Sequence, residues 1–365
     1  MLQPFEPAEP SMTSTSRTHR RLAGLAAVAA AAIATAAPAA AAPAERVDAT
    51  APEVRSYWTA ERMREAEPVS DLAPQAAPTD AAPAPVLGGA APSWVAPADA
   101  AGAGGAKLRD GEPKGRELAL ISHPVRNPSE PGMRMHGRVF FTIPTGEEAG
   151  DYSCSGTAVN SRNERVVWTA GHCVFERSGG GYVTNWTFVP GYQDGAAPFG
   201  EWPARKLLAT SRYRNADDLR YDFGAAVVAR NSSGQALQDV VGARGIAFGQ
   251  PRDQTYNAFG YPVALQFTGN RREFRCTSDE QGGDRFYSSN PRPLAITCDM
   301  TGGASGGGWV GRGGVVLSVT SYGYPNDPLT LYGPYLGTAA EAMYRQAAHK
   351  PKRKHRGGKG KGGRR

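Results

Sequence analysis

Two short segments of this 365-residue chain combine residue types that could carry out nucleophilic catalysis. The first, TAGHC at positions 169–173, contains His172, and the second, GASGG at 303–307, contains Ser305. A serine hydroxyl is a weak nucleophile at neutral pH, and a hydrogen-bonded imidazole can accept its proton as it attacks. The two segments therefore predict a nucleophilic serine, provided that the fold brings them together.

The elements that must position these residues are short β-strands. From about Arg138 onward, β-rich runs are bounded by glycine and polar turns, and no long helix separates them. This pattern predicts an antiparallel all-β sandwich or barrel, and the number of strands alone does not distinguish a barrel from a jelly roll. We expect strands over 138–143, 154–159, 165–169, 182–189, 223–228, 294–298 and 315–320, and one helix over 338–348.

The N-terminus predicts export. Residues 12–42 have a basic start, an alanine-rich apolar stretch and a small-residue end, which are typical of a secretory signal peptide. The apolar stretch is shorter than the about 20 residues that a membrane span needs, so we expect no transmembrane segment in the mature protein. We therefore predict a signal peptide over 1–42, with Met12 as an alternative start, and a secreted protein. The pair Arg20-Arg21 leaves the choice between Sec and Tat export open.

Two further regions differ in composition from the globular part, which we place at 118–348. Residues 43–117 are rich in Ala and Pro and are expected to form a disordered propeptide or linker, with 45–67 as one short helix. Residues 349–365 hold nine Lys or Arg and no acid, so removing them takes the formal charge from +7 to −2. Such a disordered basic tail could bind anionic wall polymers through their phosphates. It has no aromatic residue for base stacking, so no specific nucleic-acid partner is expected.

The chemistry-bearing segments resemble one known family. VVWTAGHC at 166–173 is similar to the histidine motif of the chymotrypsin-fold, trypsin-like serine peptidases, and CSGT at 154–157 is similar to its upstream half. Ala304 stands where animal zymogens usually carry an aspartate, and in this respect the chain resembles the secreted bacterial glutamyl endopeptidase-like members. The resemblance implies two six-stranded antiparallel β-barrels followed by the C-terminal helix. It also implies a monomeric serine endopeptidase, often made as a zymogen, that acts on proteins or peptides without a cofactor.

The resemblance also assigns roles to particular residues. Ser305 would be the nucleophile, His172 the general base and then acid, and Asp222 the residue that orients the imidazole. The backbone N–H groups of Gly303 and Ser305 would form the oxyanion hole. Asp222 is favoured because YDFGAAVV at 221–228 continues into an apolar strand.

Two alternatives for this chemistry follow from the same residues. Asp217 and Asp218 lie in the same region as Asp222, but among polar residues typical of a solvated loop. The serine segment also satisfies the GxSxG pattern of α/β-hydrolases, a fold in which the histidine follows the serine. The only later histidines, His349 and His355, lie in the basic tail, which argues against that fold.

The four cysteines, Cys154, Cys173, Cys276 and Cys298, allow three disulfide pairings. The resemblance implies the local one, in which Cys154 pairs with Cys173 and Cys276 pairs with Cys298. A zinc site is a poor alternative, because no CxxC pair or histidine cluster accompanies them. No metal is therefore expected.

Substrate preference stays open at this level. Ser321-Tyr322-Gly323 resembles the family's strand that pairs with an extended substrate. Asp299 lies six residues before Ser305, the spacing of the aspartate that binds Lys or Arg in trypsin-like enzymes, but it could equally bond to backbone. Thr320 stands where the glutamate-specific enzymes have a histidine. A different class of function, an inactive module that binds anionic polymers through the basic tail, remains the alternative to an enzyme.

Overall fold

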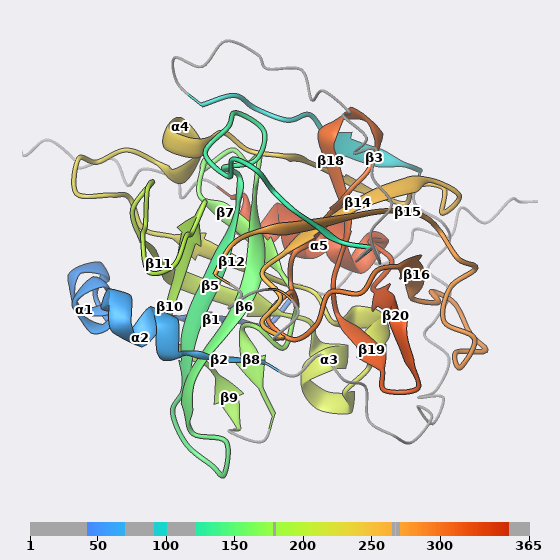
Figure 1. Ribbon diagram of the computed structural model, residues 1–365, viewed down its shortest axis with the longest axis horizontal. Coiled ribbons are helices and arrows are strands. Elements are labelled where there is room, and N and C mark those ends of the chain that lie inside the picture. The colour runs from blue at the N-terminus through green and yellow to red at the C-terminus, as the bar shows by residue number, and fades with distance from the viewer. Residues whose placement is uncertain are drawn as a thin grey trace, which may run out of the picture. The chain divides into compact units, whose positions relative to one another are not determined.

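The computed structural model describes residues 42–69, 91–100, 121–177, 180–264, 267 and 271–349. Within these ranges the chain is mostly β-structure, as predicted, and it has a few short helices besides the expected C-terminal one (Figure 1). The predicted signal peptide up to residue 41 and the basic tail from residue 350 lie outside the described residues.

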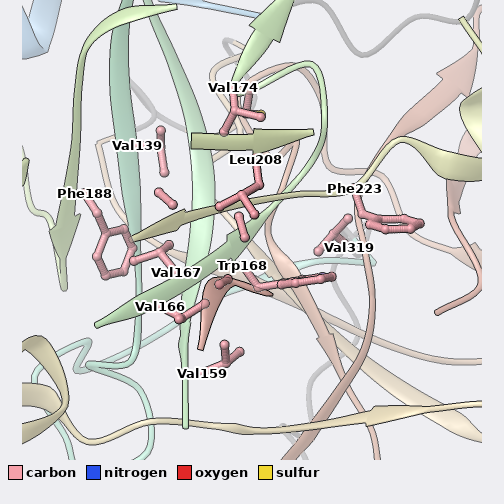
Figure 2. Packing of buried hydrophobic residues seen from close by; sticks show 14 of the residues in the cluster. Val139, Val159, Val166, Val167, Trp168, Val174, Phe188, Leu208, Phe223 and Val319 are labelled. Carbon is pink, nitrogen blue, oxygen red and sulfur yellow. The ribbon is translucent and has the colours of Figure 1, made fainter. Parts of the chain in front are cut away.

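The first half of the globular part is a closed six-stranded antiparallel barrel. Strand β11 pairs with both β10 and β12, so the sheet closes and has no free edge at that point. Figure 2 shows Val139, Val167 and Leu208 among the side chains that fill its interior, and all three are fully buried. The six strands are β5 (His136–Ile143), β6 (Gly150–Val159), β7 (Val166–Thr169), β10 (Thr184–Pro190), β11 (Trp202–Ala209) and β12 (Gly224–Val228).

The second half consists of two sheets joined by a bridge between Glu280 and Ile296. The larger sheet contains, in spatial order, β3 (Ser93–Val95), β13 (Gly245–Phe248), β18 (Val315–Val319), β17 (Gly308–Val310), β14 (Thr255–Gly260), β15 (Phe274–Asp279) and β4 (His123–Pro124). The smaller one contains β16 (Leu294–Thr297), β20 (Asp327–Gly333) and β19 (Tyr322–Tyr324).

The predicted C-terminal helix is α5 (Thr338–Ala347). Asn163 Nδ2 donates to the Ala347 carbonyl at 2.7 Å, and Tyr344 Oη donates to the Asn160 carbonyl at 2.6 Å, so the helix is fastened to the first barrel. The remaining short elements are β8 (Phe175–Glu176), β9 (Gly181–Tyr182), α3 (Ser211–Ala216), η1 (Leu219–Tyr221), α4 (Leu237–Val241) and η3 (Arg312–Gly314). In the described part of the chain, no helix is long and apolar enough to cross a membrane.

The Ala/Pro-rich region agrees in part with the sequence prediction. Within 43–117, predicted as a disordered propeptide or linker with one short helix over 45–67, residues 44–68 form β1 (Ala44–Arg46), α1 (Ala51–Tyr57), α2 (Ala60–Glu65) and β2 (Glu67–Pro68), and β3 lies further on. Two short helices thus stand where one is predicted, and the strands are not predicted. These stretches are ordered because a few large side chains, hidden in the average composition, are buried. Val54, Trp58 and Met63 are each 2% exposed or less.

Candidate active site

His172 lies immediately after β7, in the loop that leads to β8. Its Nδ1 is 2.8 Å from Asp222 Oδ2, and its backbone N–H donates to Asp222 Oδ1 at 2.8 Å. Gly171 makes this approach sterically feasible, since a Cβ there would lie 2.8 Å from Asp222 Oδ1 and 3.0 Å from the Tyr213 ring. The histidine backbone and ring are therefore both held by one carboxylate.

The Asp222 carboxylate is fully buried and receives a third hydrogen bond, from Ser321 Oγ at 2.5 Å. A buried carboxylate at Nδ1 favours the tautomer in which Nδ1 carries the proton. His172 Nε2 is then the nitrogen with a lone pair, which is the form that a general base requires. The hydrogen bond from Ser321 to Asp222 is not predicted from the sequence, where Ser321 is assigned only to the strand that pairs with substrate.

The alternative acids lie elsewhere. Asp217 pairs with Arg177, with 3.6 Å between Oδ1 and Nη1. Asp218 Oδ1 pairs with Arg220 Nε at 2.7 Å, and the same oxygen caps η1. Of the three neighbouring aspartates, Asp222 is the one whose carboxylate contacts His172.

The loop that carries Ser305 packs against β6 and against the loop that carries the histidine. The Ser305 carbonyl accepts a hydrogen bond from the Ser155 N–H at 2.7 Å and contacts the Cys173 sulfur at 3.6 Å. Cys173 follows His172 directly and forms a disulfide with Cys154, the neighbour of Ser155. The disulfide thus joins the two supports of the serine loop, and the Ser305 side chain is fully buried beside them.

The two peptide groups expected to form the oxyanion hole are oriented by their carbonyls. The Gly302 carbonyl accepts from the Val263 N–H at 3.0 Å, and the Ala304 carbonyl accepts from the Gly307 N–H at 3.0 Å. In a trans peptide the N–H points opposite to the carbonyl, so the N–H groups of Gly303 and Ser305 point away from these anchors. Gly303 has φ +91°, a conformation that glycine adopts without steric cost.

Ser155 is a further residue of this loop's support that the sequence did not single out. Its Oγ donates to the Gly303 carbonyl at 2.8 Å and accepts from the Tyr261 N–H at 3.0 Å. With its own N–H on the Ser305 carbonyl, Ser155 holds both ends of the Gly303–Ser305 turn. The only sequence signal was its place between Cys154 and Gly156 in the motif at 154–157.

The Asp299 carboxylate binds backbone N–H groups of the protein itself. Its Oδ2 accepts from the Ile121 N–H at 3.0 Å, and its Oδ1 accepts from the Ser122 N–H at 2.9 Å. Asp299 is only 8% exposed. Of the two interpretations of Asp299, the geometry favours the carboxylate that bonds to backbone.

The other specificity candidates lie in β19 and in the short link that joins it to β18. Thr320 Oγ1 accepts from Trp309 Nε1 at 3.0 Å, and the Thr320 carbonyl accepts from the Gly306 N–H at 2.7 Å. Tyr322 and Gly323 lie in β19, paired with β20, and Tyr322 Oη donates to the buried Asp284 at 2.6 Å. The Thr320 hydroxyl and the Tyr322 ring are thus part of the protein's own packing.

Both predicted disulfides are present, Cys154–Cys173 and Cys276–Cys298. Two groups of potential metal ligands occur in the described residues, one around His172 and one around Asp299. Each of them consists of one of these residues and a disulfide. Disulfide sulfurs are not thiolates, so neither group offers the ligand set of a zinc site.

A closed barrel with a histidine–aspartate pair, packed against a glycine-rich serine loop, defines the class of chymotrypsin-fold serine peptidases. Among solved structures, the protease Anisep from Arthrobacter nicotinovorans is 38% identical, with a TM-score of 0.55 over 60% of this chain and 98% of its own. The thermostable serine protease AL20 from an extremophilic microorganism is 37% identical, with a TM-score of 0.54 over 59% and 97%. The chain belongs to this family of bacterial chymotrypsin-fold serine proteases.

Two curated Bacillus proteins are more distant. The glutamyl endopeptidase of Bacillus licheniformis is 26% identical over 180 residues, which cover 44% of this chain and 55% of that protein. A protein of Bacillus subtilis named extracellular metalloprotease is 24% identical over 182 residues, 46% of this chain and 56% of its own length. The chain thus spans just over half of the curated relatives that it matches. No family model matches the chain.

Proposed function

We propose that this protein is a secreted serine endopeptidase in which Ser305, His172 and Asp222 form the catalytic triad. The observation that carries the proposal is the double contact of Asp222 with His172, at 2.8 Å to Nδ1 and 2.8 Å to the backbone N–H. A carboxylate that fixes both the ring and its backbone selects one tautomer and one orientation of the imidazole.

The reaction would proceed in two stages, acylation of Ser305 and hydrolysis of the acyl-enzyme. Ser305 Oγ attacks the peptide carbonyl carbon while its proton moves to His172 Nε2, and the N–H groups of Gly303 and Ser305 stabilise the oxyanion. The imidazolium then protonates the amine as the C–N bond breaks, leaving an acyl group on Ser305. Water, deprotonated by His172, attacks the ester, and Ser305 regains its proton when the acid leaves. Asp222 stabilises the imidazolium at each stage without accepting a proton.

Secretion is part of the proposal. It is supported by the signal-peptide pattern over 12–42 and by two disulfides, which persist in oxidising compartments. Peptide substrates are supported by the relationship to proteases. The engagement of Asp299 with backbone N–H groups gives no support to a preference for Lys or Arg.

The direct test is to treat the purified protein with a fluorophosphonate and to map the adduct by mass spectrometry. The adduct is expected on Ser305 and should be absent from Ser305→Ala, which should also lose peptide hydrolysis. Cleavage of a mixed peptide library by the same preparation would give the substrate preference. Peptide hydrolysis that persists in Ser305→Ala would refute the proposal, and retained activity after deletion of 349–365 would separate catalysis from any role of the tail.

A further inference from the structure

The residues 44–69, here called the N-terminal segment, form a folded layer on the first barrel. Strand β1 pairs with β11, with Ala44 opposite Leu208. Helices α1 and α2 follow, and Figure 1 shows them in blue beside β10 and β11, with β2 continuing to β6. The segment lies outside residues 121–349, which contain the expected triad and both disulfides.

The N-terminal segment contacts the barrel through a buried apolar centre surrounded by polar contacts. Trp58 is buried with its ring centroid 5.4 Å from that of Phe140, and its Nε1 donates to the Asn185 carbonyl at 2.5 Å. Polar contacts surround this apolar centre. Asp151 of β6 accepts from Tyr57 Oη at 2.7 Å and pairs with Arg62 at 3.0 Å. An aromatic anchor inside a polar rim is the usual anatomy of a specific interface.

Strand β2 brings the segment to the catalytic loop. It pairs in parallel with β6, with Pro68 opposite Ser153, and the Val69 N–H donates to the Ser153 carbonyl at 3.1 Å. Two residues further along β6, about 7 Å at the rise of a strand, Ser155 binds the carbonyl of Ser305. Pro68 also lies against Gly303, since a Cβ on that glycine would be 3.7 Å from Pro68 Cβ.

The serine loop is held on one side by Thr320 and on the other by β6, and these two contacts show which side of the substrate cleft β2 covers. Residues 321–323, where the acyl part of a substrate is expected, continue from Thr320, whose carbonyl binds Gly306. Strand β6 supports the loop from the first barrel, through Ser155 and Ser305. A peptide that crosses the nucleophile from 321–323 must therefore leave along β6, where the edge at Ser153 is already paired.

We infer that the N-terminal segment is a built-in inhibitor that occupies the leaving-group side of the substrate cleft. This inference rests on the proposed function. The segment occupies the edge of β6 at Ser153, and a substrate that extends beyond its scissile bond must displace the segment from that edge. A substrate with a small leaving group does not reach that edge and is not affected. Inhibition therefore depends on the length of the substrate on one side only.

The test compares two substrates on the full-length chain. One is a peptide anilide that ends at the scissile bond, and the other is a quenched peptide that extends several residues beyond it. Pro68→Gly removes the ring that faces Gly303, Trp58→Ala removes the buried anchor, and Ser56→Ala changes an exposed residue of the same helix as the matched control. In the first two variants kcat/KM for the extended peptide should rise about tenfold or more, equivalent to about 1.4 kcal/mol of weakened segment binding. The anilide rate and the Ser56→Ala rates should stay within about twofold.

A second measurement does not need catalysis. In a Ser305→Ala background, the affinity for the extended peptide, read by fluorescence anisotropy, should increase by the same factor in Pro68→Gly. Equal behaviour of both substrates in folded Pro68→Gly and Trp58→Ala would overturn the inhibitor and leave the proposed function intact. Tighter binding of the extended peptide without hydrolysis of either substrate would overturn the proposed function and leave the occupied cleft intact.

Discussion

Ser155→Ala is the substitution whose effect can be worked out most fully from the structure. The hydroxyl donates to the Gly303 carbonyl at 2.8 Å and accepts from the Tyr261 N–H at 3.0 Å, and Ser155 is 1% exposed. Removing it leaves a buried carbonyl and a buried N–H without partners, at about 1–3 kcal/mol each. We expect a loss of about 2–4 kcal/mol in the free energy of unfolding, because some relaxation will reduce the sum.

The same substitution should also reduce the rate of the chemical step. The Gly303 carbonyl belongs to the peptide that follows the expected oxyanion donor, so its release allows the turn to rotate. Complete loss of one oxyanion donor costs about 10²–10³-fold in kcat. A displaced donor should cost less, and we expect kcat to fall by about 10–100-fold with KM nearly unchanged.

The assay is steady-state hydrolysis of an activated ester by the purified variant, together with its thermal unfolding. Ser318→Ala is the matched control, since Ser318 is a buried serine whose Oγ donates at 2.8 Å to the Pro334 carbonyl and not to the serine loop. It should lower Tm without lowering kcat. If Ser155→Ala lowered Tm but kept kcat within about twofold, the hydroxyl would have no part in orienting the oxyanion donors.

Three other changes test separate parts of the structure. Asp222→Asn should lower kcat by about 10⁴-fold while the protein stays folded, because the amide stabilises the wrong tautomer of His172. Ester hydrolysis measures the loss of kcat, and unfolding curves show that the variant is folded. Burial raises the pKa of Glu201 to about 7, against an opposing effect of Arg55. The folded protein therefore holds this proton more tightly than the unfolded chain does, and the resulting contribution to the free energy of unfolding is present below pH 4.5 and is lost as the pH rises through 7. After allowance for solvent screening, Glu201→Gln should therefore add about 1 kcal/mol at pH 8 and little at pH 4, as measured by urea unfolding. Asp299→Ala should lower Tm by several degrees, since it frees the Ile121 and Ser122 amides, and leave the library cleavage profile unchanged; a lost preference for Lys or Arg would contradict its backbone role.

The parts of the fold that the sequence predicted are those with a strong local pattern. All seven expected strands overlap observed ones, and the expected helix coincides with α5 within one residue. Strand β7 and strand β12 are continuous apolar runs, and pairing them places the loop after Thr169 beside the residues before Gly224. The proximity of His172 and Asp222 follows directly from that register.

The unpredicted parts depend on contacts between distant residues. Strand β11 has no alternating pattern in WPARKLLA, yet it closes the barrel by pairing on both sides. The contacts of Asp299 depend on residues 121 and 122, far away in the sequence, so spacing alone could not distinguish a substrate contact from a backbone one. Trp58 lies in a segment whose average composition indicates disorder, and its burial against Phe140, far away in the sequence, is one of the contacts that order the segment.

The glycines around Ser305 show how one pattern can have opposite physical meanings. In isolation, a run of glycines indicates a flexible linker. Here a Cβ on Gly306 would overlap Thr169 Oγ1, and one on Gly307 would overlap the Phe259 carbonyl oxygen. The glycines are thus required by close packing of the serine loop against both halves of the fold. Because Gly306 lies against the residue that ends β7, a larger side chain there would separate the serine loop from the histidine loop. The spacing between Ser305 and His172 therefore depends on the absence of a side chain as much as on the two residues themselves.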